Sequence, residues 1–220
     1  AGDVTILARD IAPTAAPPWM LPADKVAAVD DALDGSPIDL DANILAVNVS
    51  VAGSGQTAVS GAVMGNVVTN AVEASITNGS TVLAGVDAVD GDVLDAASDV
   101  LVSGRTDAGI IAFSVGVGAS GQTAVQASGF GNVITNRTSA MIEDSIVASG
   151  GNAGVSAEDQ SQIRSLALSV AGSGSTAVGV LVGANVIVND VNAVISGSTA
   201  TSHGALSVVA ENDSDILAFT

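Results

Sequence analysis

The stretch SGQTAV at residues 54–59 recurs along the chain, as SGQTAV at 120–125 and as SGSTAV at 173–178. Twelve residues after the first serine of each copy lies an asparagine, and ten residues before that serine lies an isoleucine. The copies begin 66 and then 53 residues apart. Because several landmarks recur in the same order, we interpret the chain as an array of internal repeats, which is typical of stacked, solenoid-like folds.

The repeat unit is about 53 residues long. A strand-like segment ends six residues before each of Ile110, Ile163 and Ile216, which fixes the same phase in successive copies. The first interval therefore carries 66 − 53 = 13 extra residues. We place this insert at 86–98 and interpret it as a projecting loop.

A second insert lies near the start of the chain. The segment at residues 4–8 matches the same strand-like landmark, but Ile44 follows it by 36 residues in place of 6, so about 30 residues are inserted at 11–40. This insert is rich in proline and has apolar residues at helical spacing, which predicts a short helix at 23–35. We expect residues 1–220 to form one solenoid fragment of a longer chain. Its units begin near residues 44, 110, 163 and 216.

Each unit consists of short runs of Val, Ile, Ala and Thr separated by Gly, Ser and Asn, as in strands and turns. In VNVSV at 47–51, valine alternates with small polar residues, which places the two kinds on opposite faces of a strand. These patterns predict an all-β fold, a right-handed parallel β-helix (β-solenoid) with one short helical, Pro-rich insert. Two or three coils per unit would give roughly 18 to 27 residues per coil and a rod about 30 to 45 Å long. Aliphatic rows are expected to fill its interior.

The composition fits a narrow interior and excludes several classes of function. Aromatic residues make up 2% of the chain while glycine contributes 25 residues, so bulky rings are too few to anchor a thick core. The net charge of −18 repels nucleic acid and anionic membrane surfaces. Cysteine is absent, and Gly, Ser, Asn or Thr interrupts every apolar run, so we expect neither a disulfide nor insertion into a membrane.

Asparagines recur at two positions of the repeat. Stacked copies of Asn can bond one another through their side-chain amides, and Asn also tolerates the tight turns at solenoid corners. We therefore predict a structural role, in ladders between coils, for six of them. They are Asn66, Asn70, Asn132, Asn136, Asn185 and Asn189.

The insert at 86–98 concentrates carboxylates, which are hard oxygen ligands suited to Ca²⁺. Four of them fall within nine residues, namely Asp87, Asp90, Asp92 and Asp95. Their spacing fits neither an EF-hand nor the nonapeptide of calcium-binding β-rolls. A solvated acidic loop that keeps the rod soluble is therefore the main interpretation, with a calcium site as the alternative and no other cofactor expected.

Residues suited to catalysis are scarce. His203 is the only histidine, and neither a Gly-x-Ser-x-Gly elbow nor a phosphate-binding Gly-x-x-x-x-Gly-Lys motif occurs. The five Lys and Arg residues and the single Trp are too few for the charged grooves or ring platforms of carbohydrate-active β-helices. The sequence therefore predicts a protein that is not an enzyme.

The repeats also resemble those of a known class of proteins. SVAGSGQTAV followed by GNVVTN, and SVAGSGSTAV followed by GANVIVN, are similar to the repeats of very large bacterial surface proteins. These are the leukotoxin-like filamentous adhesins and haemagglutinin-type exoproteins, which are secreted by autotransporter or two-partner routes. The resemblance covers residues 2–10 and about 43–220. It implies export to the cell surface, a right-handed β-helix stalk and roles in adhesion or surface filaments, without catalytic residues.

Together these observations predict a non-catalytic structural segment, a stalk or filament, of a secreted bacterial cell-surface adhesin. The expected partners are neighbouring coils of the same longer chain, a second copy stacked end to end, or a host or surface glycan or protein. Two alternatives remain open. One is a carbohydrate-binding or carbohydrate-cleaving β-helix, and the other is a subunit of a self-assembling extracellular fibre.

Overall fold

The computed structural model describes residues 2–12 and 42–220, and every regular element in this part of the chain is a β-strand. The helix expected at 23–35 and most of the Pro-rich insert lie outside the described residues. The strands are β1 (Val4–Ile11), β2 (Ile44–Ser54), β3 (Thr57–Ile76), β4 (Thr81–Ala84), β5 (Val100–Asp107), β6 (Gly109–Ser120), β7 (Thr123–Glu143), β8 (Ile146–Ser149), β9 (Ala153–Asp159), β10 (Gln162–Ser173), β11 (Thr176–Ser196), β12 (Thr199–Ser202), β13 (Leu206–Asn212) and β14 (Asp215–Phe219).

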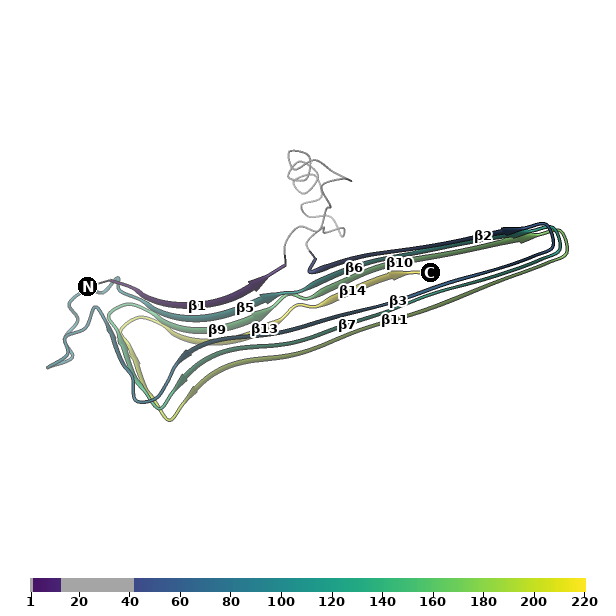
Figure 1. Ribbon diagram of the computed structural model, residues 1–220. Helices are drawn as coiled ribbons and strands as arrows, with labels where there is room; N and C mark the ends of the chain where they lie inside the picture. Colours follow the sequence, from purple (N-terminus) through teal and green to yellow (C-terminus); the bar gives the residue numbers. More distant parts are fainter. Residues whose placement is uncertain (1, 13–41) are drawn as a thin grey trace.

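The strands form four parallel sheets. Their orders are β1-β5-β9-β13, β2-β6-β10-β14, β3-β7-β11 and β4-β8-β12. The chain passes once through each sheet in every turn, as from β5 through β6, β7 and β8 to β9 (Figure 1). This arrangement is a parallel β-helix, so the predicted all-β solenoid fold is confirmed.

One coil contains 53 residues. Val100 in β5 pairs with Ala153 in β9, and Ala153 pairs with Leu206 in β13, each partner lying 53 residues further along the chain. The repeat unit is therefore a single coil, and the expectation of two or three coils per unit is wrong. The reason is strand length, because β7 and β11 are each 21 residues long whereas strands of about five or six residues are usual.

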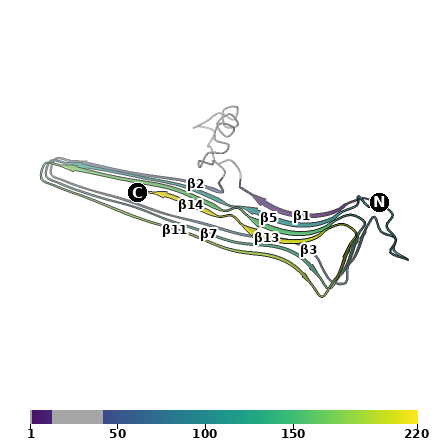
Figure 2. The ribbon, with the colours of Figure 1, turned by 180° about the vertical axis from the view of Figure 1, so that it is seen from behind.

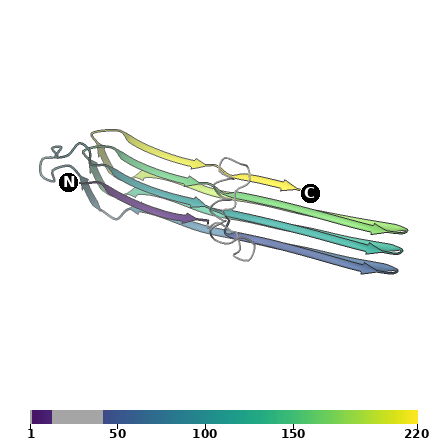
Figure 3. The same ribbon diagram turned by 90° about the horizontal axis from the view of Figure 1, so that it is seen from above.

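Long strands make the molecule extend across the solenoid axis rather than along it (Figure 3). A strand of 21 residues spans about 70 Å, while the first and last of three stacked strands lie only about 10 Å apart. A short stack of wide, flat coils therefore replaces the expected rod of about 30 to 45 Å.

The register also locates the extra residues. The offset between paired strands is 96 residues at β1–β5 and 66 at β2–β6, so 96 − 66 = 30 extra residues lie between β1 and β2. It is 66 at β3–β7, 65 at β4–β8 and 53 at β5–β9. Of the 13 extra residues in the first interval, 66 − 65 = 1 therefore lies in the turn after β3 and 65 − 53 = 12 lie between β4 and β5.

Each coil has a wide part and a narrow part (Figures 1 and 2). In the narrow part, which we call the arm, β2, β6 and β10 run outward to a tip and β3, β7 and β11 return facing them. The arm comprises the stacked residues 46–70, 112–136 and 165–189. The remaining described residues form the head, where three sheets surround a wider interior.

An aliphatic core fills the head. Val102, Ile142 and Val155 are at most 1% exposed and pack together with alanines of neighbouring strands. A second cluster, which includes Ile110 and Ile134, lies at the base of the arm. Burial of these side chains supplies the hydrophobic stabilisation of the coils.

Beyond this base, the interior of the arm is small and polar. Ser114, Gln126 and Ser128 are buried there. The two facing sheets approach so closely that a Cβ atom on Gly116 would lie 1.5 Å from Gln126 Nε2. Rows of large aliphatic side chains do not fit in this space.

The valines of the arm point outward as a consequence. Val47, Val49 and Val51 are 57, 64 and 73% exposed, while the alternate residues Asn48 and Ser50 are more buried. The expectation that aliphatic rows fill the whole interior is therefore wrong for the arm. Alternation separates two faces of a strand, but the distance between the sheets decides which face lies inside.

Candidate functional site

Three of the six asparagines singled out in the sequence form a hydrogen-bonded column inside the arm. Asn66 Nδ2 donates to Asn132 Oδ1 at 2.7 Å, and Asn132 Nδ2 donates to Asn185 Oδ1 at 2.8 Å. Asn185 Nδ2 in turn donates to Ser165 Oγ at 2.7 Å. The in-register pairing of β3, β7 and β11 stacks these residues. Their amides bond one another and so join three successive coils.

The other three asparagines do not bond one another. Asn136 Nδ2 donates to Asp159 Oδ2 at 3.1 Å and to Ser161 Oγ at 2.8 Å, and Asn189 Nδ2 donates to the same carboxylate at Oδ1. Asn70 Nδ2 is buried without a hydrogen-bond partner, as are Asn136 Oδ1 and Asn189 Oδ1. These three asparagines therefore form no ladder, because the side-chain amides of Asn136 and Asn189 donate to the Asp159 carboxylate across the interior.

Asp159 is a fully buried carboxylate in the head. Burial raises its pKa above the ordinary value, because the charged form is poorly solvated there. Hydrogen bonds from Ser161 and Asn136 oppose this shift in pKa, and the charge of Asp107 adds to it. The protonation of Asp159 is therefore coupled to the stability of the fold.

The acidic loop between β4 and β5 uses its carboxylates to cap its own turns. Asp87, Asp90 and Asp95 each accept, through Oδ1, the backbone N–H of the residue two positions later, at 2.7, 3.1 and 3.0 Å. The Ala97 N–H and then the Ser98 hydroxyl lower the pKa of Asp95. Asp92 lies in the same loop and donates its backbone N–H to Asp90. These contacts are typical of Asx turns.

No group of three or more His, Cys, Asp or Glu side chains is arranged to hold a metal ion in residues 2–12 and 42–220. The calcium site at the acidic loop therefore stays a prediction. Calorimetric titration with Ca²⁺, with the melting temperature compared in chelator, would test it.

An open cleft of about 290 Å³ lies where the head meets the arm. Outward-facing polar side chains of β5, β10 and β14 and of the turns beside them line it, and Ala12 reaches it from the end of β1. The charged and amide side chains of the lining are Arg105, Asp107, Gln160, Gln162, Arg164, Asp213 and Asp215. The carboxylates of the acidic loop do not line this cleft.

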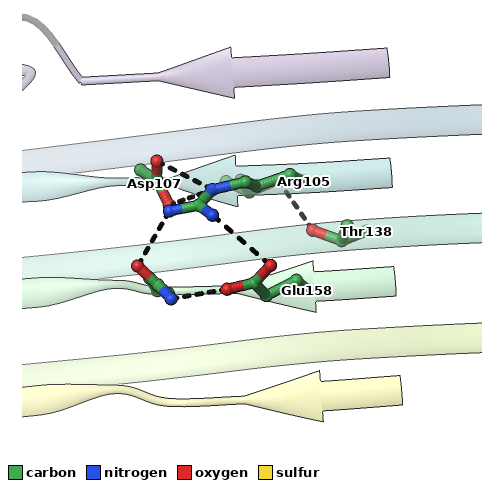
Figure 4. A network of polar contacts seen from close by, with 6 residues as sticks. Arg105, Asp107, Thr138 and Glu158 are labelled. Atoms are coloured by element: carbon green, nitrogen blue, oxygen red, sulfur yellow. Dashed lines mark hydrogen bonds and ion pairs between the residues drawn. The ribbon is translucent and has the colours of Figure 1, made fainter. Parts of the chain in front are cut away.

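Arg105 is the centre of a polar network beside the cleft (Figure 4). Its Nε donates to both carboxylate oxygens of Asp107 at 3.1 Å. Its other nitrogens donate to Glu158 Oε2 at 3.4 Å and to Gln160 Oε1 at 2.9 Å, both on the next coil. The hydrogen bond to Asp107 raises the pKa of Arg105, and the charges of Asp107 and Glu158 add to that effect. The network links two coils across the outer surface.

The cleft offers a small polar ligand carboxylate and amide groups together with two guanidinium groups. Both guanidinium groups already hold carboxylates, since Arg164 pairs with Asp215 one coil further on. A bound anion would have to displace these ion pairs, whereas a neutral hydroxyl-rich ligand would not. Among the described residues, His203 lies elsewhere, with Nδ1 3.1 Å from the carbonyl oxygen of Ser149.

The sequence reading missed this cleft, although a signal for it exists. Arg105 and Glu158 are separated by 53 residues, one period of the repeat, so their opposite charges occupy the same position on adjacent coils. Neighbouring opposite charges on parallel strands attract each other.

Comparison with known proteins provides no relative for this chain, because no family model, no curated protein and no solved structure matches it. In the described part of the chain there is no helix long and apolar enough to cross a membrane.

Proposed function

We propose that the chain is a structural segment of a longer β-solenoid, a non-catalytic stalk or filament of a bacterial cell-surface adhesin. The observation that carries this proposal is the uncovered interior of the last coil. Ile110 and Ile163 are 0% exposed, whereas Ile216, the next residue in the same column, is 43% exposed.

The same change occurs in a second column, in the core of the head. Val102 and Val155 are buried, whereas Val208, which stacks on Val155, is 48% exposed. These aliphatic side chains, together with the unpaired edge of β11, are covered when one more coil is added in register. A solenoid gains stability from each interface between coils, so the neighbouring coil is the partner that this surface fits.

The polar contacts of the chain also support a structural role. The column of Asn66, Asn132 and Asn185 and the bridge from Arg105 to Glu158 both connect one coil to the next. Extracellular location and the adhesin context rest on the resemblance of the repeats to those of filamentous surface proteins.

Lengthening the chain by one coil tests this proposal. Thr220 follows Phe219, which pairs with Leu166, so a second copy of residues 168–220 appended after Thr220 continues the register for 53 residues. We expect the melting temperature to rise by about 5 °C or more, because half-exposed aliphatic side chains become buried. A chain carrying the same 53 residues in shuffled order is the control. Equal melting temperatures for the two chains would contradict the proposal.

End-to-end assembly into a fibre is an alternative use of the same uncovered coil. If copies stack in this way, the melting temperature of the chain rises with protein concentration. Filaments in electron micrographs of the purified chain would favour this alternative over a stalk.

A carbohydrate-binding or carbohydrate-cleaving protein is the second candidate, favoured by the polar cleft at the junction of head and arm. Glycan arrays probed with the chain and with Arg105→Ala test it. Binding that Arg105→Ala abolishes, and that Asp92→Ala and Asp95→Ala leave intact, would favour a sugar site in the cleft. Absence of binding agrees with a stalk.

A further inference from the structure

The arm of this acidic protein contains no charged residue. None of the 23 Asp and Glu or the 5 Lys and Arg residues of the chain falls within 46–70, 112–136 or 165–189. The net charge of −18 is therefore carried by the rest of the chain. A long, charge-free region that is exposed on two sides is unusual, because exposed surfaces of soluble proteins are ordinarily rich in charge.

Both outer sides of the arm are apolar, and we call the side formed by β3, β7 and β11 the valine face. It consists of the outward residues of β3, β7 and β11 between Thr57 and Thr69 and their stacked partners. Its most exposed valines include Val59, Val63, Val67, Val182, Val186 and Val188. Val63 is 82% exposed and Val182 is 64% exposed. Between these valines lie only Gly, Ala and Thr, so no polar side chain longer than Thr interrupts the face.

The area of the valine face is large enough for an interface. Thirteen residues of three strands cover about 43 Å by about 14 Å, or roughly 600 Å². This is the upper end of the largest apolar patch that a typical monomer exposes. Two such faces in contact would bury about 1,200 Å², the lower end of the range for specific interfaces. Each additional coil widens the face.

We propose that the valine face packs against the valine face of a second copy of this chain. An uncharged, apolar surface made of flat β-strands is complementary to itself, since two such sheets can pack face to face about 10 Å apart. Contact through the arms brings together regions that carry no charge and leaves the acidic heads exposed to solvent and counterions.

The open strand edges argue against a lipid partner. β3 and β11 are the edges of their sheet, and along the arm no described strand pairs with their free side. Backbone groups left unpaired in the hydrocarbon of a bilayer are costly, whereas water solvates them in a complex between two copies. A protein partner, which covers the valine face and leaves the strand edges hydrated, therefore fits this surface better than a lipid bilayer does.

Lysine substitutions on the valine face test the proposal. Val63→Lys and Val182→Lys should each weaken self-association about 100-fold, because each buries an unpaired charge in the interface. Both side chains are exposed in a single copy of the chain, so circular dichroism and the melting temperature measured in dilute solution should not change. Val89→Lys is the matched control, since Val89 is 95% exposed on the acidic loop and the same charge is added there. Sedimentation velocity from about 1 μM to about 1 mM, the range in which an interface of this size associates, measures the effect.

A second readout reports contact at the face itself. The chain contains no cysteine, so spin labels can be placed singly at Val63→Cys or Val89→Cys. We expect dipolar broadening between copies at position 63 and none at position 89. Broadening at 63 should disappear when the labelled chain also carries Val182→Lys.

Three results would overturn the proposal. The first is a chain that stays monomeric up to about 1 mM without partners. The second is association that persists unchanged in Val63→Lys and Val182→Lys. That result would point to the opposite side of the arm, where Val51 is 73% exposed, or to end-to-end stacking through the uncovered coil, and would leave the proposed solenoid stalk untouched. The third is a chain that stays monomeric and partitions into neutral phosphatidylcholine vesicles, since that would identify lipid as the occupant of the face.

Discussion

The head and the arm use the same alternation of residues with opposite orientation. In the head, Val102 and Val155 lie inside the coil and are at most 1% exposed. In the arm, Ser114 and Gln126 lie inside, and Val49 is 64% exposed on the outer surface. Valine therefore marks the core in one region and the surface in the other.

The spacing of the sheets explains the difference. Three sheets surround the interior of the head and leave room for aliphatic side chains, whereas two sheets face each other in the arm. There, a Cβ atom on Gly183 would lie 2.5 Å from the ring of Phe130, so the one large ring inside needs a glycine on the adjacent coil. A period-2 pattern thus identifies the two faces of a strand but does not identify the core.

The sharpest test of this contrast is the same substitution in the two regions. Val102→Asp should lower the free energy of unfolding by more than about 4 kcal/mol, because it places an unpaired carboxylate in the aliphatic core. Val49→Asp should lower it by about 1 kcal/mol or less, since its side chain lies in water. Urea unfolding followed by circular dichroism in dilute solution measures both. Equal losses would show that the arm has an aliphatic interior after all.

The asparagine column tests whether polar groups hold the arm together. Asn132→Ala leaves the Asn66 donor and the Asn185 acceptor unpaired inside the arm, so we expect a loss of about 2 to 4 kcal/mol. Asn66→Ala, at the end of the column, removes one hydrogen bond and should cost about half as much. The same urea titration distinguishes the two variants. A neutral Asn132→Ala would mean that water replaces the amide without cost.

The close approach of the sheets in the arm can be tested at Gly116. Gly116→Ala forces the Gln126 side chain aside and disturbs its hydrogen bonds to Ser128 and Ser169, which should cost about 1 to 3 kcal/mol. In a chain that already carries Gln126→Ala, the same substitution should cost less, because the closest clash is removed, although Ser128 Oγ still lies 2.6 Å from the added Cβ. A double-mutant cycle from thermal unfolding gives the coupling. Additive effects would place the two side chains apart.

The buried carboxylate in the head predicts a pH dependence. Because burial raises the pKa of Asp159, the folded state binds its proton more tightly than the unfolded state, whose value is near 3.8. Its contribution is therefore most favourable below that value and is lost as the pH rises through the folded-state pKa. Asp159→Asn should flatten this part of the profile and raise the melting temperature at neutral pH. The unpaired Asn136 Oδ1 can accept a hydrogen bond from the new amide.

Melting curves of the wild type and of Asp159→Asn between acidic and neutral pH provide the measurement, and their difference cancels the contributions of the other acids. A difference that grows in favour of the wild type as the pH rises would contradict the assigned direction.

The periodicity of the chain was sufficient to predict stacking. Residues at the same position of the repeat occupy one column, as Asn66, Asn132 and Asn185 do, and Arg105 and Glu158 could have been paired by the same reasoning. The length of a coil could not be predicted in this way, because the repeat does not show how often the chain turns within one unit. The second asparagine column also escaped prediction, since its partner Asp159 faces it from another sheet.

Stacking of in-register parallel strands follows from the sequence alone, because the shared order of landmarks in successive copies permits only one alignment of the coils. The tertiary structure alone decided which face of each strand lies inside, where the buried carboxylate finds its donors and where the polar cleft forms. The physical reason is that these features depend on the distance between sheets. That distance is set by strands far apart in the coil, and no local pattern records it.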